Sequence, residues 1–379
     1  MPNYVQQNGI QSTFLRLNPK NGAVYSIVGI SDTLAMSTES AALAAMTVVA
    51  PSLAPEAVAS AVESQFGLVG EFSPLVSERD QNFLLRSVGG DKYVAKVTSA
   101  SEKATATDFQ IAGLLYLGRD AELLVPKVYR TLAGDAIGEI GDESGLYRLR
   151  VVTWVSGDPL ESLPLDTAAC QKLGAALAHL DYAFTGFSHP GENQVLLWDL
   201  QRVVALRELI ENISDSPLLG RVECAIDDFE KSVLPVIGNL RAQVIHADAN
   251  PGNILLADGA IGFIDFSDIV RAPLVFDVAI AASYLRSFEA DPLQFVVPFV
   301  EAYHARMPLN SQEADLLFDL VRARLATTVT LLYWRLSARA EDDPYRQKTL
   351  ETEAGAERYL ELLDSLGRTK FRQKLSFIQ

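Results

Sequence analysis

Cysteine and positive charge are both scarce in this chain of 379 residues. The two cysteines, Cys170 and Cys224, lie in apolar helical patterns, so we expect reduced thiols in a core rather than a disulfide framework. There are 32 Lys and Arg residues against 48 Asp and Glu residues, and the net charge is −16. Nucleic acids and anionic membranes bind to basic surfaces, so we expect neither as a partner. A cationic small molecule would suit the acidic balance.

The sequence also lacks a hydrophobic run long enough to cross a bilayer. Its most apolar early stretch, Ala41 to Pro51, is too short and follows Asp32 and Glu39. No basic segment followed by an apolar one begins the chain, as it would in a secretory signal. We therefore expect a cytoplasmic protein. A hydrophobic content of 49% with 21% charged residues predicts an ordered chain of about two domains.

Residues 1–52 carry little structural signal, and we treat them as an N-terminal extension of unclear structure. Ala23 to Ile30 could form a strand, and Ser37 to Ala50 could form a helix of small residues. Neither pattern is linked to the chemistry that follows.

What the chain does contain is one stretch rich in polar chemistry, from Val244 to Ser267. Two short apolar runs, Asn253 to Leu256 and Ile261 to Ile264, flank the residues Ala-Asp-Gly-Ala. Asp-Gly tolerates the positive φ angles of a tight turn, so the pattern predicts a β-hairpin. Pro and Gly in the preceding loop stop any regular element there.

The hairpin and its loop would bring Asp248, Asn253 and Asp265 to one place. Two carboxylates and a carboxamide oxygen form a hard, oxygen-only set that suits Mg²⁺ together with phosphate oxygens. An isolated Asp-Ala-Asn is most often a solvated turn. Three such residues inside an apolar hairpin favour a functional site instead.

The pattern His246-x-Asp248, then Asn253, then Asp265-Phe266 resembles the catalytic and metal loops of the kinase fold, in the version used by aminoglycoside phosphotransferases and choline-kinase-like enzymes. The resemblance implies that Asp248 accepts the proton of the acceptor hydroxyl and that Asn253 and Asp265 hold Mg²⁺. It also implies that His246 braces the loop, and that Asp277 supports it further along the chain.

The segment before this stretch matches the small lobe of a kinase in its order of elements. We expect a helix, three strands and a second helix, over Leu53–Phe66, Phe72–Val76, Asn82–Val88, Lys92–Val97 and Lys103–Leu117. Lys96 lies in the third strand among apolar neighbours. Taken alone it could face solvent, but the resemblance implies that it contacts the α- and β-phosphates.

Two positions depart from the kinase pattern. Gln110 stands where the resemblance would place the glutamate that pairs with Lys96, although its amide oxygen can still accept a hydrogen bond. The loop from Ser77 to Asn82 lacks the glycines of a phosphate-binding loop. Its N–H groups and the Ser77 and Asn82 side chains could donate to phosphates, or it could be a plain polar turn.

The strand Leu146 to Val155 has the character of the hinge on which a purine sits. On this interpretation the backbone of Thr153, Trp154 and Val155 pairs with the base edge. A buried strand end is the alternative, because backbone contacts leave no side-chain signal.

The second half of the chain is mainly helical by its apolar spacing. We expect helices over Ala168–Leu180, Val195–Leu209, Leu218–Val233, Phe295–Met307 and Ala314–Arg339. Of the polar and aromatic residues in the last helix, Trp334 and Arg335 are candidates for the acceptor pocket.

The segment Pro-Leu-Val-Ser-Glu-Arg-Asp-Gln-Asn-Phe, Gln110 and the sequence Trp-Asp-Leu at Trp198 are similar to the hydroxylysine-kinase-like branch of the superfamily. The resemblance covers roughly residues 55–345. It implies an α+β, protein-kinase-like fold of two lobes: a small antiparallel β-sheet lobe over residues 53–155, which binds the nucleotide, and a mainly helical lobe over 156–379, which binds the acceptor.

The implied reaction transfers the terminal phosphoryl group of ATP or GTP, with Mg²⁺, to a hydroxyl of a small amine-bearing metabolite such as a hydroxylated amino acid or amino alcohol. Two alternatives stay open: an aminoglycoside O-phosphotransferase, and a nucleotide-binding regulator without catalysis. A homodimer is compatible with the sequence.

Overall fold

The computed structural model describes residues 50–77, 79–100, 102–142, 145–338, 350, 353 and 355–379. These residues belong to one compact unit. The strand and the helix expected within residues 23–50 lie outside them, apart from Ala50, which is not helical.

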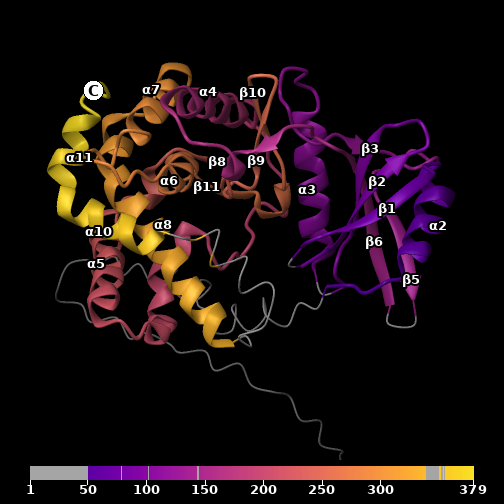
Figure 1. Ribbon diagram of the computed structural model, residues 1–379, viewed down its shortest axis with the longest axis horizontal. Helices are drawn as coiled ribbons and strands as arrows, with labels where there is room; N and C mark the ends of the chain where they lie inside the picture. Colours follow the sequence, from indigo (N-terminus) through magenta and orange to yellow (C-terminus); the bar gives the residue numbers. More distant parts are fainter. Residues whose placement is uncertain are drawn as a thin grey trace, which may run out of the picture. The chain divides into compact units, whose positions relative to one another are not determined.

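The first described lobe is built on an antiparallel sheet (Figure 1). Its strands run in the order β1-β2-β3-β6-β4, and β5 also pairs with β6. They are β1 (Gly70–Leu75), β2 (Gln81–Ser87), β3 (Lys92–Val97), β4 (Val128–Tyr129), β5 (Gly138–Asp142) and β6 (Gly145–Thr153). A tight turn joins β2 to β3, and its Gly90 has a φ of 93°, which favours glycine.

The two faces of this sheet have different roles. Helix α2 (Pro55–Phe66) packs on one face, and its buried residues Val58, Val62 and Phe66 share a core with Ala95 and Val97 of β3. Because successive side chains of a strand alternate between faces, Lys96 points to the other side. On that side Val94 and Val152 pack against the core of the second lobe.

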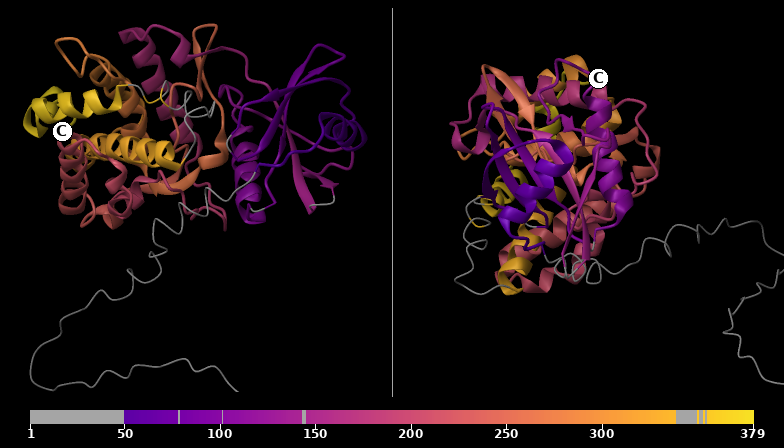
Figure 2. Two further views of the ribbon diagram at one scale, coloured as in Figure 1. Left: turned by 60° about the horizontal axis from the view of Figure 1, so that its bottom comes forward. Right: turned by 90° about the vertical axis from the view of Figure 1, so that its right-hand side faces the viewer.

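Helix α3 (Ala104–Leu117) links the two lobes. Its residues Phe109, Leu114 and Leu117 belong to the hydrophobic core of the second lobe, whereas its N-terminal end lies beside the sheet (Figure 2). Gln110 is 2% exposed and lies on a turn of this helix between the sheet and the second lobe.

The second lobe is mainly helical. Its α-helices are α4 (Thr167–Ala183), α5 (Ser216–Ser232), α6 (Leu274–Tyr284), α7 (Val296–Arg306), α8 (Ser311–Ala338), α10 (Ala356–Leu366) and α11 (Arg368–Lys374). Asp166 and Asp215 begin α4 and α5 by accepting hydrogen bonds from the backbone N–H groups of Ala169 and Leu218. The middle of α8 is buried on nearly every side.

Helices α4 and α7 cross at very close range. A Cβ atom at Gly174 of α4 would lie 2.0 Å from the carbonyl oxygen of Phe299 in α7. No side chain larger than hydrogen fits at this crossing without moving one helix.

Two small sheets carry the polar loops of this lobe. The predicted hairpin is confirmed as β9 (Ile254–Ala257) and β10 (Ala260–Phe263), and β7 (Asp158–Pro159) pairs with β9. Its turn residues Asp258 and Gly259 have φ angles of 49° and 84°. A second pair joins β8 (Ala242–Ile245) to β11 (Val270–Pro273).

Two local predictions are wrong. The segment Val195–Leu209 is not one α-helix: Trp198 lies in a turn, Asp199 caps the following residues, and a 3₁₀-helix runs over Leu200–Glu208. Cys224 is exposed rather than buried, because the buried stripe of the amphipathic α5 passes through Val222, Ala225 and Ile226. Cys170 is buried, as expected. The overall α+β architecture is as predicted.

Candidate active site

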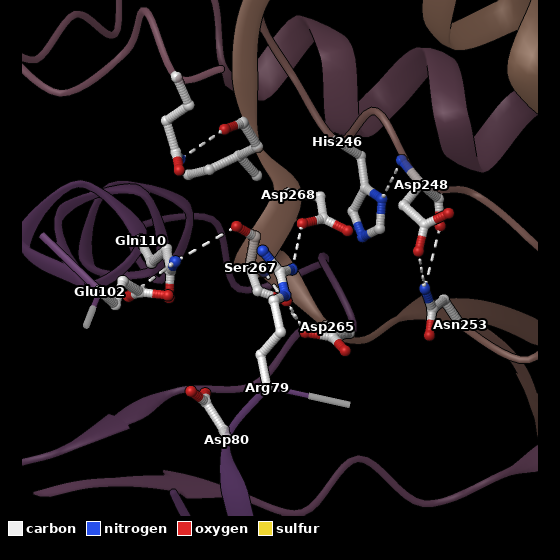
Figure 3. A network of polar contacts seen from close by, with 12 residues as sticks. Arg79, Asp80, Glu102, Gln110, His246, Asp248, Asn253, Asp265, Ser267 and Asp268 are labelled. Atoms are coloured by element: carbon white, nitrogen blue, oxygen red, sulfur yellow. Dashed lines mark hydrogen bonds and ion pairs between the residues drawn. The ribbon is translucent and has the colours of Figure 1, made fainter. Parts of the chain in front are cut away.

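The loop before β9 holds Asp248 in a fixed position (Figure 3). Asn253 donates its amide N–H to the Asp248 carboxylate at 2.7 Å and to the Asp248 carbonyl oxygen at 3.1 Å. Asn250 donates a second hydrogen bond to the same carboxylate, at 3.0 Å. Asn253 Nδ2 is thereby directed to Asp248, which leaves the Oδ1 atom of Asn253 on the other side of the amide.

His246 and Asp277 stabilise the backbone of this loop. The Asp277 carboxylate accepts from the backbone N–H groups of His246, at 3.0 Å, and Ala247, at 2.8 Å. Ala247 has a φ of 62°, an unfavourable conformation for a non-glycine residue that the surrounding bonds must maintain. The His246 ring accepts from the N–H of Asp248 and lies 3.1 Å from the carbonyl oxygen of Ile264, so a neutral ring protonated at Nε2 satisfies both contacts.

A second buried carboxyl group lies behind Asp277. Asp181 of α4 is fully buried and accepts a hydrogen bond of 2.7 Å from the Tyr303 hydroxyl of α7. Burial and the neighbouring Asp277 raise the pKa of Asp181 well above its usual range. A proton on Asp181 lets the two carboxyl groups share a hydrogen bond, and Asp277 then keeps its charge for the loop.

Asp265 follows β10 and meets Lys96 from the sheet of the first lobe. The Lys96 ammonium lies 3.4 Å from Asp265 Oδ1, and the Ser267 hydroxyl donates to the same oxygen. Burial alone would raise the pKa of Asp265, but Lys96 and Ser267 together lower it below the ordinary range. Asp265 therefore stays ionised, with a φ of 59° that turns its side chain toward the gap between the lobes.

Gln110 does not contact Lys96. Its oxygen accepts from Arg150 Nη1 at 2.5 Å, and its Nε2 donates to the carbonyl oxygen of Ser267 at 3.2 Å. Arg150, which is directly opposite Lys96 on the paired strand β6, also binds Asp80 at 2.8 Å. The amide thus connects the first lobe to the loop that carries Asp265.

The two candidates in the β1–β2 loop are separated. Ser77 lines a cavity between the lobes. Asn82 lies opposite Lys96 on β2, and its Oδ1 atom is buried with no hydrogen-bond partner. Arg79, between them, also lines the cavity.

The hinge candidates lie at the end of β6. The N–H groups of Thr153 and Trp154 donate to the carbonyl oxygens of Lys127 and Lys92, at 2.9 and 3.0 Å. Val155 packs beside β10, where a Cβ atom at Gly262 would lie 3.1 Å from its Cγ1 atom. These three residues lie outside the lining of the cavity.

The cavity itself has a volume of about 230 Å³ and collects the polar groups of both lobes. Both basic and acidic side chains line it: Arg79, Lys96, Arg324 and Arg335 with Asp80, Glu102, Asp248, Asp265, Asp268 and Glu353. Trp198, Tyr284 and Leu331 are among the remaining lining residues. Of the two acceptor-site candidates, Arg335 lines the cavity and Trp334 packs on the core.

Arg324 of α8 sets the charge around Asp248. Its Nη2 atom lies 3.5 Å from Asp248 Oδ1, and its other nitrogen donates to the Trp198 carbonyl oxygen at 2.9 Å. Burial, with the nearby Asp268, raises the pKa of Asp248 to about 7, and Arg324 opposes this rise. A carboxyl group that titrates near neutral pH is suited to accept a proton during a reaction.

Arg79, Arg150, Asp181, Asp268, Tyr303 and Arg324 were not among the residues predicted from the sequence. Arg324 did leave a signal, because a charged residue in the middle of an apolar helix must have a buried partner. Arg79 and Arg150 left none, since their partners are remote in sequence.

The donor set fits a magnesium ion. Asp265 keeps an ionised carboxylate in the gap between the lobes, and the Asn253 amide is oriented so that its oxygen is free of Asp248. No group of three His, Cys, Asp or Glu side chains in the described chain could hold a metal by itself. Phosphate oxygens and water would have to complete the site, which is the usual arrangement for Mg²⁺.

An ionised carboxylate beside a lysine from the opposite sheet, with a second carboxyl group on the loop before a hairpin, is the arrangement expected of a phosphotransferase of the kinase-like fold. Sequence comparison agrees: the family described as "Phosphotransferase enzyme family" matches residues 71–317, and the chain belongs to this family.

Relatives and a solved structure indicate which phosphotransferases this chain resembles. The chain is 28% identical to hydroxylysine kinase of Mus musculus over 326 residues, which are 78% of this chain and 86% of that protein. It is 27% identical to a homoserine kinase of Nitrobacter winogradskyi over 254 residues, 64% of this chain and 72% of that protein. Its fold is similar to that of the amicoumacin kinase hAmiN, solved with AMP-PNP, Ca²⁺ and Ami, with a TM-score of 0.62 at 16% identity, over 85% of this chain and 94% of that one.

The predicted kinase-like fold and family are confirmed by these findings. The protein is a kinase that acts on a hydroxyl group of a small molecule. Within the residues that the structure covers, the helices are too short or too polar to cross a membrane.

Proposed function

We propose that this protein transfers the terminal phosphoryl group of ATP or GTP to a hydroxyl of an amine-bearing metabolite, either a hydroxylated amino acid or an amino alcohol. The observation that carries the proposal is that one cavity is lined by Asp248, Asp265 and Lys96 together with further acidic and basic side chains. Relatives named for hydroxylysine and homoserine support the acceptor class.

In the proposed reaction, the acceptor oxygen attacks the γ-phosphorus and its proton passes to Asp248. The bond from the γ-phosphorus to the bridging oxygen breaks, and the nucleoside diphosphate leaves with that electron pair. Lys96 binds the phosphates that remain. A Mg²⁺ ion held by Asn253 and Asp265 would neutralise charge on the phosphate oxygens.

Arg324 keeps Asp248 ready for this role. Its charge favours the ionised carboxylate, and the hydrogen bonds from Asn250 and Asn253 orient the carboxylate without protonating it. Most of the rate enhancement would come from positioning and charge neutralisation rather than from covalent chemistry.

The acceptor end of the cavity supports a zwitterionic substrate. Glu353 and Tyr284 could bind an ammonium group, and Arg335 could bind a carboxylate. We also propose residues 53–155 and 156–379 as the two functional lobes. The purine base of the nucleotide would bind at the hinge, Thr153–Val155. Cytoplasmic location and homodimer formation stay predictions.

A screen tests the proposal. Hydroxylysine, homoserine, simple amino alcohols and aminoglycosides would each be offered with ATP and with GTP, and nucleoside diphosphate release would be coupled to a spectroscopic signal. We expect turnover with a hydroxylated amino acid or an amino alcohol. Turnover with aminoglycosides alone would favour the resistance-type activity, and no turnover with any acceptor would favour a nucleotide-binding regulator.

A further inference from the structure

Arg79 reaches from the first lobe into the second at the centre of the cavity. It lies in the short loop between β1 and β2, the loop that contains none of the glycines expected of a phosphate-binding loop. Its Nη2 atom lies 2.5 Å from Asp268 Oδ1, and its guanidinium carbon lies 5.1 Å from the centre of the Trp198 ring. Figure 3 shows this side chain extending to Asp268, with Asp265 beside it.

The base of the Arg79 side chain is anchored by the next residue. Asp80 forms a buried ion pair of 2.8 Å with Arg150, whose side chain is 4% exposed. Arg150 is held in turn by the oxygen of Gln110. The loop is thereby tied to both the sheet and α3, so Arg79 projects from a rigid support rather than from a free turn.

The tip of Arg79 is held but not saturated. The ion pair with Asp268 engages Nη2, whereas a guanidinium group has five N–H donors. The Trp198 ring provides a second contact, with its centre 5.1 Å from the guanidinium carbon. Arg79 lines the same cavity as Lys96, Asp248 and Asp265, so its remaining donors are available to a ligand there.

Cationic side chains from both lobes lie beside the carboxylates of this cavity. Lys96 lies 3.4 Å from Asp265 and Arg79 lies 2.5 Å from Asp268, and from the second lobe Arg324 lies 3.5 Å from Asp248. Three cations therefore surround the space between the base and the metal-binding carboxylate. The group that crosses this space during the reaction is the phosphoryl group.

We propose that Arg79 binds the transferring phosphoryl group, in place of the backbone N–H groups of a glycine-rich loop, and that Asp268 and Trp198 position its guanidinium. The proposal rests on the proposed function, because it requires a nucleoside triphosphate in the cavity. Arg79 is then a catalytic residue and Asp268 a positioning residue. A fork of parallel N–H donors suits two oxygens of one phosphoryl group.

The test compares Arg79→Met and Arg79→Lys with Arg119→Met as a matched control. Arg119 is exposed and also stacks on an aromatic ring, 5.0 Å from the centre of Tyr116, but lies outside the cavity. For each variant, kcat would be measured with the acceptor from the screen. Dissociation constants would be measured for ADP and for AMP-PNP with Mg²⁺, and thermal unfolding would be followed in parallel.

We expect Arg79→Met to lower kcat by about 100-fold, the effect of removing one charged donor from a transition state. The affinity for AMP-PNP should fall while that for ADP stays unchanged, since ADP lacks the transferring group. Arg79→Lys should recover part of the loss, because the charge returns without the fork. Arg119→Met should behave as the wild type.

An unchanged kcat in Arg79→Met would overturn the inference. So would an equal loss of ADP and AMP-PNP affinity together with a lower unfolding temperature, which would mark Arg79 as a purely structural bridge. The binding arm needs no acceptor. If the wild type binds neither nucleotide, the proposed function itself fails; if the wild type prefers AMP-PNP and Arg79→Met keeps that preference, only the role of Arg79 fails.

Discussion

The loop and hairpin of the second lobe differ from the β1–β2 loop and α3 of the first lobe in how their polar groups are held. In the hairpin region, Asp248 and Asn253 are five residues apart and bind each other directly. In the first lobe, Gln110 and Asp80 lie 40 and 70 residues from Arg150, and the three still form a continuous chain of contacts. The first arrangement is local and the second depends on the whole fold.

This difference shows which part of a kinase-like site can vary. Asp248 and Asn253 lie in one loop and Asp265 follows the hairpin that this loop leads into, so their relative positions depend on one short segment. The connection between α3 and the sheet holds the two lobes together. Here Gln110 and Arg150 make this connection, in place of the lysine–glutamate pair that the kinase resemblance led us to expect. Four experiments separate the two regions.

The largest effect is expected in the hairpin region, for Asp248→Asn. The amide cannot accept the hydroxyl proton, so kcat should fall by about 1,000-fold, within the range of general-base contributions. Binding of AMP-PNP, measured by calorimetry, should be almost unchanged. Full activity in this variant would refute Asp248 as the base.

Arg150→Met tests the long-range network. Removal of one member of a buried ion pair leaves Asp80 without its partner and should lower the free energy of unfolding by about 3 kcal/mol. Chemical denaturation measures this change. Arg148→Met is a suitable control, since Arg148 lies two residues away on the same strand and pairs with the exposed Asp108. An equal loss of unfolding free energy in both variants would mean that the buried network contributes no more to stability than the Arg148–Asp108 pair.

Asp277→Asn tests the support of the catalytic loop. An amide can accept from only one of the two N–H groups of His246 and Ala247, so the free energy of unfolding should fall by about 2 kcal/mol. Asp258→Asn, in the exposed hairpin turn, should change it little, because asparagine also tolerates a positive φ. Loss of activity without loss of stability would instead place Asp277 in the chemistry.

The smallest effect concerns pH. With a pKa of about 7 in the free enzyme, Asp248 is ionised above that pH and protonated below it, so kcat/KM should rise with pH and reach roughly one-tenth of its maximum at pH 6. Arg324→Met removes a charge that favours ionisation, and the rise should move to higher pH. Arg324→Lys should keep the wild-type profile more closely. A profile that moves to lower pH in Arg324→Met would contradict this assignment.

The sequence predicted the local features of this protein well. Apolar alternation located β1, β2, β3 and β6 of the first lobe to within about two residues but missed the short strands β4 and β5, and Asp-Gly located the hairpin turn. The closeness of Asp248 and Asn253 was predictable because they are five residues apart in one loop. The roles of these two residues and of Asp265 rest on the resemblance to the kinase fold and stay predictions. The turn at Trp198 was missed, since a 3₁₀-helix and an α-helix have similar apolar spacing over one or two turns.

The residues that the sequence could not identify act through partners far along the chain. Arg79 needs Asp268, 189 residues away, and nothing near either residue indicates the contact. Gln110 was placed correctly on the inner side of its helix, but its partner was expected to be Lys96. The neighbouring strand offers Arg150 at closer range, and only the strand register of the folded sheet determines that choice.

The missing side chain at Gly174 has a consequence far from the crossing itself. Two turns later α4 carries Asp181, and one turn after Phe299 α7 carries Tyr303, so the distance between the two helix axes decides whether this acid and this phenol meet. An added methyl group there would push the two helices apart. The hydrogen bond from the Tyr303 hydroxyl to Asp181 would lengthen, and with it the contact of Asp181 with Asp277. The reaction would then be disturbed from a position outside the active site.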